Sequence, residues 1–122
     1  MVQERTSETT KGKSMKAPDL EKFQIMYILR GHDVEHTTDV RAWEKMFKNT
    51  KTRQVAESKT NDVWVSTVFL GFDHNWGDGP PLLFETMVFG GKLDQEQKRY
   101  STWDEAVRGH AAIVERVRKG NQ

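Results

Sequence analysis

The stretch DVWVSTVFLGF at residues 62–72 decides the fold of this chain. It is rich in β-branched and aromatic residues and is apolar at both alternating sets of positions, which predicts a central strand covered on both faces. Its expected antiparallel partner is LLFETMVF at residues 82–89. Pairing Phe72 with Leu82 defines the expected main core face, which carries Trp64, Val68, Leu70, Phe72, Leu82, Phe84 and Val88. The opposite face carries Val65, Thr67, Phe69, Leu83, Glu85 and Met87, and it is therefore mixed.

Three weaker strand signals flank this pair. The apolar residues 23–29 have the length of a strand and run into turn chemistry at residues 30–33. Residues 53–58 are compatible with a short polar strand that turns into the central one. Residues 98–100, Lys-Arg-Tyr, are compatible with an edge strand.

Two helices complete the pattern. Asp39 precedes Val40, Trp43 and Phe47, whose spacing predicts a short amphipathic helix that ends near residue 49. Thr102 and Glu105 have the spacing of a capping box, and a helical stripe then continues to about residue 119. The order of elements predicts an α+β fold in which an antiparallel sheet of about four strands packs with two helices.

Composition limits the chain to one domain and removes several kinds of chemistry. Its 122 residues include no cysteine, which excludes disulfides, thiolate-bound metals and a cysteine nucleophile. Residues 1–20 are polar and charged and predict a disordered arm, and residues 21–120 form the domain. Because no apolar run approaches about 20 residues and no signal peptide is recognisable, we expect a cytoplasmic protein without a membrane partner.

Two long strings of residues resemble a known family. VSTVFLGFDHNWGDGPPLLFETMVFGG at residues 65–91, followed by RYSTWDEAVRGH at 99–110, is similar to a family of small uncharacterised proteins of tailed phages and prophages. The resemblance covers about residues 26–117. It implies an accessory protein that works in the bacterial cytoplasm of the host, and it implies no particular activity.

Four side chains are candidates for acid–base or metal chemistry: Asp73, His74, Glu85 and His110. The metal-binding version of this site uses Asp73, His74 and His110. No HExxH motif or helical histidine pair supports it, so these residues would have to be brought together by the fold. The alternative interpretation is structural, because His110 falls on the apolar stripe of its helix and would need a partner there, either Glu85 or a backbone carbonyl.

The polar residues 73–81 are the main candidate for a binding loop. Gly77 and Gly79 are followed by two prolines, but the segment lacks the lysine and the following helix of a phosphate-binding loop. Trp76 is either folded back over the sheet or exposed as an anchor for a partner. The side chains assigned to partner or ligand binding are Asp73, His74, Trp76, Asp78, Arg99 and Tyr100.

Nucleic acid is not an expected partner. The candidate cations are Lys48, Lys51, Arg53 and Lys59, with Lys98, Arg99 and Tyr100 as further contributors. Glu57, Asp62, Asp94 and Glu96 are interspersed among them, which is typical of an ordinary solvated surface. A small nucleotide would require fewer cations and is less affected by this objection.

These observations favour a non-enzymatic phage protein without a cofactor. We expect it to inhibit or sequester a host component, either an anti-phage defence protein or a nucleotide signal, and to form a homodimer or a higher homo-oligomer because one face of the sheet needs a cover. Two alternatives remain open. One is a small metal-dependent hydrolase or nuclease, and the other is a structural or morphogenetic component of the phage.

Overall fold

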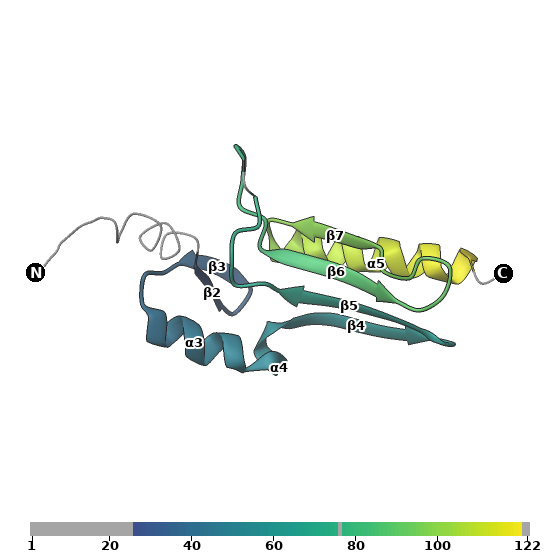
Figure 1. Ribbon diagram of the computed structural model, residues 1–122, viewed down its shortest axis with the longest axis horizontal. Helices are drawn as coiled ribbons and strands as arrows, with labels where there is room; N and C mark the ends of the chain where they lie inside the picture. The colour runs from purple at the N-terminus through teal and green to yellow at the C-terminus, as the bar shows by residue number, and fades with distance from the viewer. Residues whose placement is uncertain (1–25, 76, 121–122) are drawn as a thin grey trace, which may run out of the picture.

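A four-stranded antiparallel sheet organises the fold in a computed structural model that describes residues 26–75 and 77–120 (Figure 1). Neighbouring strands follow one another along the chain, in the order β4, β5, β6 and β7. Their bounds are Gln54–Thr60, Val63–Phe69, Phe84–Phe89 and Gln97–Tyr100. The predicted α+β class, the polar strand before residue 60 and the edge strand near residue 100 are confirmed.

The long helix α5, Trp103–Gly120, covers one face of this sheet (Figure 1). It begins with the predicted capping box: Glu105 N donates to Thr102 Oγ1 at 3.1 Å, and Thr102 N donates to Glu105 Oε1 at 3.1 Å. The core between helix and sheet consists of Val63, Val65, Val88, Ile113, Val114 and Val117 at one end. At the other end it consists of Phe69, Leu83, Phe84, Tyr100 and Ala106.

The register between β5 and β6 differs by one residue from the expected one. Phe69 lies opposite Phe84 and Val65 lies opposite Val88, whereas pairing Phe72 with Leu82 would have placed Leu70 opposite Phe84. A one-residue shift exchanges the faces of a strand. The residues of β5 that face α5 are therefore Val63, Val65, Thr67 and Phe69, and the expected core set with Trp64, Val68 and Leu70 is wrong for this strand.

The central strand is covered on one face only, contrary to the expectation of two covered faces. The second face of the sheet carries alternate residues that are half-buried: Trp64, Ser66 and Val68 on β5, and Glu85, Met87 and Phe89 on β6. Trp64 stacks on Phe89 with 4.8 Å between ring centroids, so these two aromatic side chains partly shield each other from water on the face that no helix covers.

Residues 26–53 form a smaller unit beside the sheet. Two short strands, β2 (Tyr27–Arg30) and β3 (Asp33–His36), pair as a separate hairpin, and the helices α3 (Val40–Lys48) and α4 (Thr50–Arg53) follow. The expected turn at residues 30–33 is present, but the strand after it and the short helix α4 were not predicted. Asp39 caps α3 as expected, because its side chain accepts a bond from Ala42 N at 3.1 Å.

Gly71 joins the smaller unit to the sheet. Its carbonyl oxygen accepts bonds from Tyr27 N and from Trp43 Nε1, both at 2.9 Å. Its φ of +82° requires glycine, and a Cβ atom there would lie 3.2 Å from Trp43 Nε1. A second connection is made by His32, which stacks on Trp103 of α5 with 3.9 Å between ring centroids.

Some sequence-based predictions fall on residues that the structure does not describe. These are the disordered arm at residues 1–20, the first part of the strand expected at residues 23–29, and both alternatives for Trp76. Within the described residues, no helix has the length and apolar character needed to cross a membrane.

Candidate functional site

The loop between β5 and β6 projects from one end of the sheet, away from the body of the molecule (Figure 1). Its base is closed by backbone bonds, since His74 N donates to Leu82 O at 2.9 Å and Leu70 N donates to Leu83 O at 2.7 Å. Residues 77–80 beyond this base are exposed. The loop therefore leaves the sheet from a fixed pair of anchor points.

Two side chains hold the loop in shape. Asp73 Oδ1 accepts bonds from Asn75 N at 2.7 Å and from Leu82 N at 3.0 Å, so its carboxylate ties the two sides of the loop together. The Asn75 amide donates to Asp78 O at 3.1 Å and to Pro80 O at 2.9 Å, and its oxygen accepts from Gly77 N at 2.9 Å. The loop is thus ordered by its own hydrogen bonds.

His74 is fixed as one tautomer at the base of the loop. Its Nδ1 donates to the carbonyl oxygen of Phe72 at 2.9 Å, because a carbonyl can only accept, and Nε2 is therefore the unprotonated nitrogen of the neutral ring.

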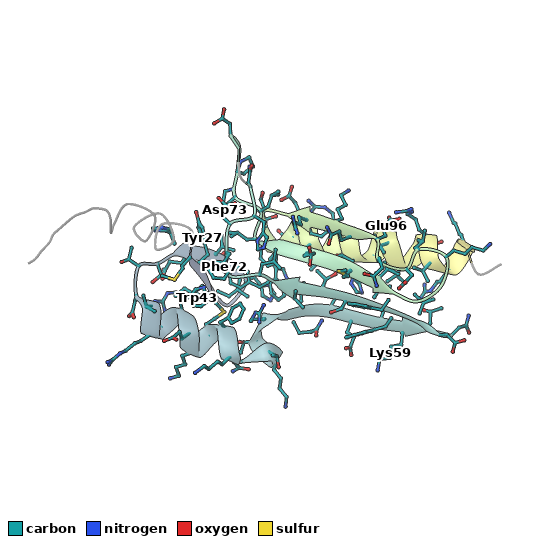
Figure 2. All side chains as sticks on the ribbon, viewed as in Figure 1. Tyr27, Trp43, Lys59, Phe72, Asp73 and Glu96 are labelled. Atoms are coloured by element: carbon teal, nitrogen blue, oxygen red, sulfur yellow. The ribbon has the colours of Figure 1, made fainter. Side chains whose placement is uncertain are left out.

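Tyr27 lies near the neighbouring Asp73, as Figure 2 shows. Burial raises the pKa of Tyr27, and the Asp73 carboxylate raises it further. Sequence reasoning missed Tyr27, because its proximity depends on how β2 packs.

His110 lies in the core instead, in a polar chain that joins α5 to all four strands of the main sheet. Its Nε2 is 2.9 Å from Ser58 Oγ on β4, and its Nδ1 is 2.7 Å from Thr67 Oγ1 on β5. Thr67 Oγ1 lies 2.5 Å from Thr86 Oγ1 on β6, which accepts a bond from Tyr100 Oη at 3.1 Å. Burial lowers the pKa of His110 and raises that of Tyr100, so both are neutral at neutral pH.

The successive hydrogen bonds of this chain all point in one donor-to-acceptor direction, from Tyr100 to Ser58. Thr86 Oγ1 accepts from Tyr100, and within the described residues its own proton has Thr67 as the available acceptor. Thr67 then donates to His110 Nδ1, and the Nε2–H group donates to Ser58 Oγ. Every buried polar atom of the chain is satisfied, which supports the structural interpretation of His110. The expected partners, Glu85 or a backbone carbonyl, are replaced by two hydroxyl groups.

Glu85 and Arg99 form an ion pair on the other face of the sheet. Arg99 Nε donates to Glu85 Oε2 at 3.0 Å. The strand register explains why this ion pair is separated from His110. Glu85 lies opposite Val68 on β5 and opposite Arg99 on β7, and all three residues face away from α5. Tyr100, next to Arg99 in the sequence, faces α5. The residues expected to bind one partner are therefore divided between the loop, the core and the open face.

The metal-binding and acid–base site is not assembled. Asp73 and His74 hold the loop, Glu85 pairs with Arg99, and both ring nitrogens of His110 are bonded within the core. Among residues 26–75 and 77–120, no group of three or more His, Cys, Asp or Glu side chains is arranged to hold a metal ion.

The sequence could have shown part of the buried chain. Thr67 and Thr86 are polar residues in otherwise apolar strands, and they lie directly opposite each other in the observed register. In the register expected from pairing Phe72 with Leu82, Thr67 and Thr86 do not lie opposite each other. The one-residue error in register therefore concealed this pair of threonines. Ser58 gave no signal in a polar strand.

A small pocket of about 250 Å³ lies between the end of α5 and the β6–β7 connection. Val63, Leu93 and Val117 make it apolar, and Lys92 and Lys119 lie at its rim. Its volume is below the range of about 300–1,000 Å³ that is usual for small-molecule sites.

Comparison of the sequence and structure with family models, curated proteins and solved structures gives no significant match.

Proposed function

We propose that this chain is a phage-encoded, non-enzymatic binding protein that presents the loop at residues 73–81 to a protein of the bacterial host, such as a component of an anti-phage defence system. The observation that carries the proposal is a projecting loop whose described residues beyond its base, Gly77 to Pro80, are exposed and yet tied to the rest of the loop by hydrogen bonds. Asp73 and Asn75 bond the loop to itself, so internal hydrogen bonds help to fix its conformation. The phage origin rests on the family resemblance.

Preorganisation of the loop favours binding. A loop that is already ordered loses less conformational entropy on binding than a flexible one. The exposed residues Gly77, Asp78, Gly79 and Pro80 offer backbone groups and one carboxylate to a partner. The pocket near Leu93 is smaller than usual small-molecule sites and supplies no support for a nucleotide signal, so the proposal takes a protein surface as the partner.

Charge reversal at the loop tests this proposal. The Asp78→Lys variant of the full chain is compared with the unchanged protein and with Asp62→Lys, an exposed carboxylate in the β4–β5 turn at the opposite end of the sheet. Each protein is immobilised, exposed to host lysate, and its bound proteins are quantified by mass spectrometry. We expect a host protein that binds the unchanged chain and Asp62→Lys and that is reduced at least about tenfold on Asp78→Lys. Equal recovery on all three would contradict the proposal.

The open face of the sheet supports self-association as part of the same proposal. Trp64, Met87 and Phe89 are half-buried there, and a second copy would remove them from water. Sedimentation velocity at micromolar concentration measures this directly, and a monomer throughout would contradict it. The remaining alternative, a morphogenetic component, predicts that the chain is abundant in purified virions, whereas an inhibitor of the host is absent from them.

A further inference from the structure

Positive charge is concentrated in one part of the chain. Residues 40–60 contain six Lys or Arg and two Glu, which leaves thirteen cations and sixteen carboxylates for the rest of the sequence. A net charge of +1 therefore conceals a segment of +4. These residues form α3, α4 and β4, which follow one another along a single edge of the molecule, with β7 at the far edge of the sheet (Figure 1).

Most of these cations point to solvent. Arg41, Lys45 and Lys48 follow one another at intervals of four and three residues along α3, which places them on one side of the helix, and all three are exposed. Lys51 on α4 is exposed beside them. We call these four residues the basic edge. In Figure 2, side chains with nitrogen at their ends extend outward from α3 and α4, and Lys59 extends from the same edge further along β4.

Arg53 is the exception, because it is used within the fold. Its Nε donates to Phe69 O at 2.9 Å, and one terminal nitrogen donates to Phe47 O at 3.1 Å. Its guanidinium carbon also lies 4.0 Å from the centre of the Phe47 ring. Of the cations expected from sequence, Lys48 and Lys51 thus lie on the basic edge, whereas Lys98 and Arg99 lie on β7 across the sheet.

We propose that the basic edge binds the phosphate backbone of double-stranded DNA without sequence preference. The four exposed cations provide the electrostatic contact on which such binding depends. Of the two carboxylates of the segment, Glu57 accepts a hydrogen bond from Trp64 Nε1 at 3.0 Å on the open sheet face. The other, Glu44, is exposed on α3 beside these cations, so four positive charges and one negative charge share this surface. Together α3 and β4 have a combined length of roughly 35 Å, about one turn of duplex DNA.

The aromatic residues of α3 favour a duplex over a single strand. Proteins that bind single strands stack bases on exposed aromatic rings. Trp43 instead bonds Gly71 O and stacks on Phe47 with 4.7 Å between ring centroids, and both rings contact Phe72. No exposed aromatic residue lies on α3 or α4 to receive an unpaired base.

Fluorescence anisotropy with a labelled 30-base-pair duplex tests the proposal on the full chain, at salt concentrations from 50 to 300 mM. With about four phosphate contacts, we expect log K to fall with log salt with a slope of about −3 to −4. Lys45→Gln/Lys48→Gln should lower affinity at 50 mM salt by about tenfold or more and reduce the slope by about two.

The matched control is Arg108→Gln/Arg118→Gln, which removes the same charge from two exposed positions of α5. It should bind like the unchanged protein, and thermal unfolding should show both variants to be folded. Three results would overturn the proposal: no binding of the duplex at 50 mM salt, an equal loss in the α5 control, or tighter binding of the matching single strand. Competition by polyglutamate at a lower concentration of charge than duplex DNA would assign the edge to an acidic protein instead.

Discussion

His110 shows how one buried residue makes stability depend on pH. The residue is 6% exposed, and its ring has hydroxyl partners on both nitrogens. Burial keeps the pKa of His110 in the folded protein below the value near 6.5 of the unfolded chain. Above pH 6.5 both states are neutral, and the contribution to stability is complete. Below it the unfolded chain binds the proton first, so the free energy of unfolding falls.

We therefore expect urea unfolding to give a lower free energy of unfolding at pH 5 than at pH 7.5. The His110→Gln variant keeps a neutral hydrogen-bonding side chain, and it should show a smaller difference between the two pH values. The other three histidines, His32, His36 and His74, are present in both proteins, so any contribution they make cancels in the comparison. An equal loss of stability in the two proteins would show that His110 does not carry the effect.

Thr67 connects the two halves of the buried chain. Replacing it by valine keeps the shape of the side chain but leaves His110 Nδ1 without a donor and the Thr86 hydroxyl without an acceptor for its proton. Thr86 Oγ1 keeps the bond that it accepts from Tyr100. We expect Thr67→Val to lower the free energy of unfolding by about 1–3 kcal/mol, the usual cost of an unsatisfied buried polar group. Ser66→Ala removes a hydroxyl from the open face of the same strand and should cost well under 1 kcal/mol. Similar values for the two variants would show that the chain adds no stability.

For single residues, the sequence predicted where a side chain lies better than it predicted the hydrogen-bond partners of that side chain. The stripe of α5 placed His110 in the core, and helical spacing was sufficient for that. Its partners come from β4 and β5, and helical spacing carries no information about which strand residues face α5. Asp73 and His74 were singled out correctly as residues of the loop, but their local bonds to residues 72, 75 and 82 show that they hold its shape.

At the scale of elements, α5 approaches the sheet closely at Gly109. A Cβ atom there would lie 2.2 Å from the Tyr100 ring, so a small residue is required. Gly109→Ala should destabilise the protein by about 1–3 kcal/mol through overpacking, although alanine has the higher helix propensity. Gly120→Ala, in open space at the end of the same helix, should be neutral or slightly stabilising. A gain of stability in Gly109→Ala, measured by thermal unfolding, would contradict this close approach.

The loop should depend on Asp73 in a different way. Asp73→Ala removes the oxygen that accepts bonds from Asn75 N and Leu82 N, while the backbone bond between His74 and Leu82 remains. We expect faster amide exchange at Asn75 and Leu82 with little change in β5 or β6, measured by NMR. Unchanged exchange at both amides would show that the carboxylate does not order the loop.

The strands also explain why the register was the main error. In residues 62–72 both alternating sets are apolar, so alternation cannot decide which set faces the core. Pairing Phe72 with Leu82 places Trp64, Leu70 and Phe72 on the expected core face, whereas the structure buries the set with Val65 and Phe69. Capping and helical spacing are local signals, and the helix boundaries that depend on them were predicted closely.

For the molecule as a whole, stability should be unevenly distributed. The central strands β5 and β6 pair on both sides and pack against α5, whereas β2 and β3 form a separate two-stranded sheet. We expect hydrogen exchange to be slowest in β5 and β6 and at least about tenfold faster in the β2–β3 hairpin, because isolated hairpins are marginally stable. Equal protection in the hairpin and the central strands would show that the fold opens as one unit.

The hydrogen bonds of the loop at residues 73–81 are local, and this has a consequence for the evolution of its sequence. Its backbone bonds end at Leu82 and Leu83, and its internal bonds stay within residues 73–82. Insertions and substitutions at the tip therefore leave the registers of the sheet and the helix untouched. One scaffold can carry many different tips, and under the proposed function a change of partner would require the replacement of only a few codons.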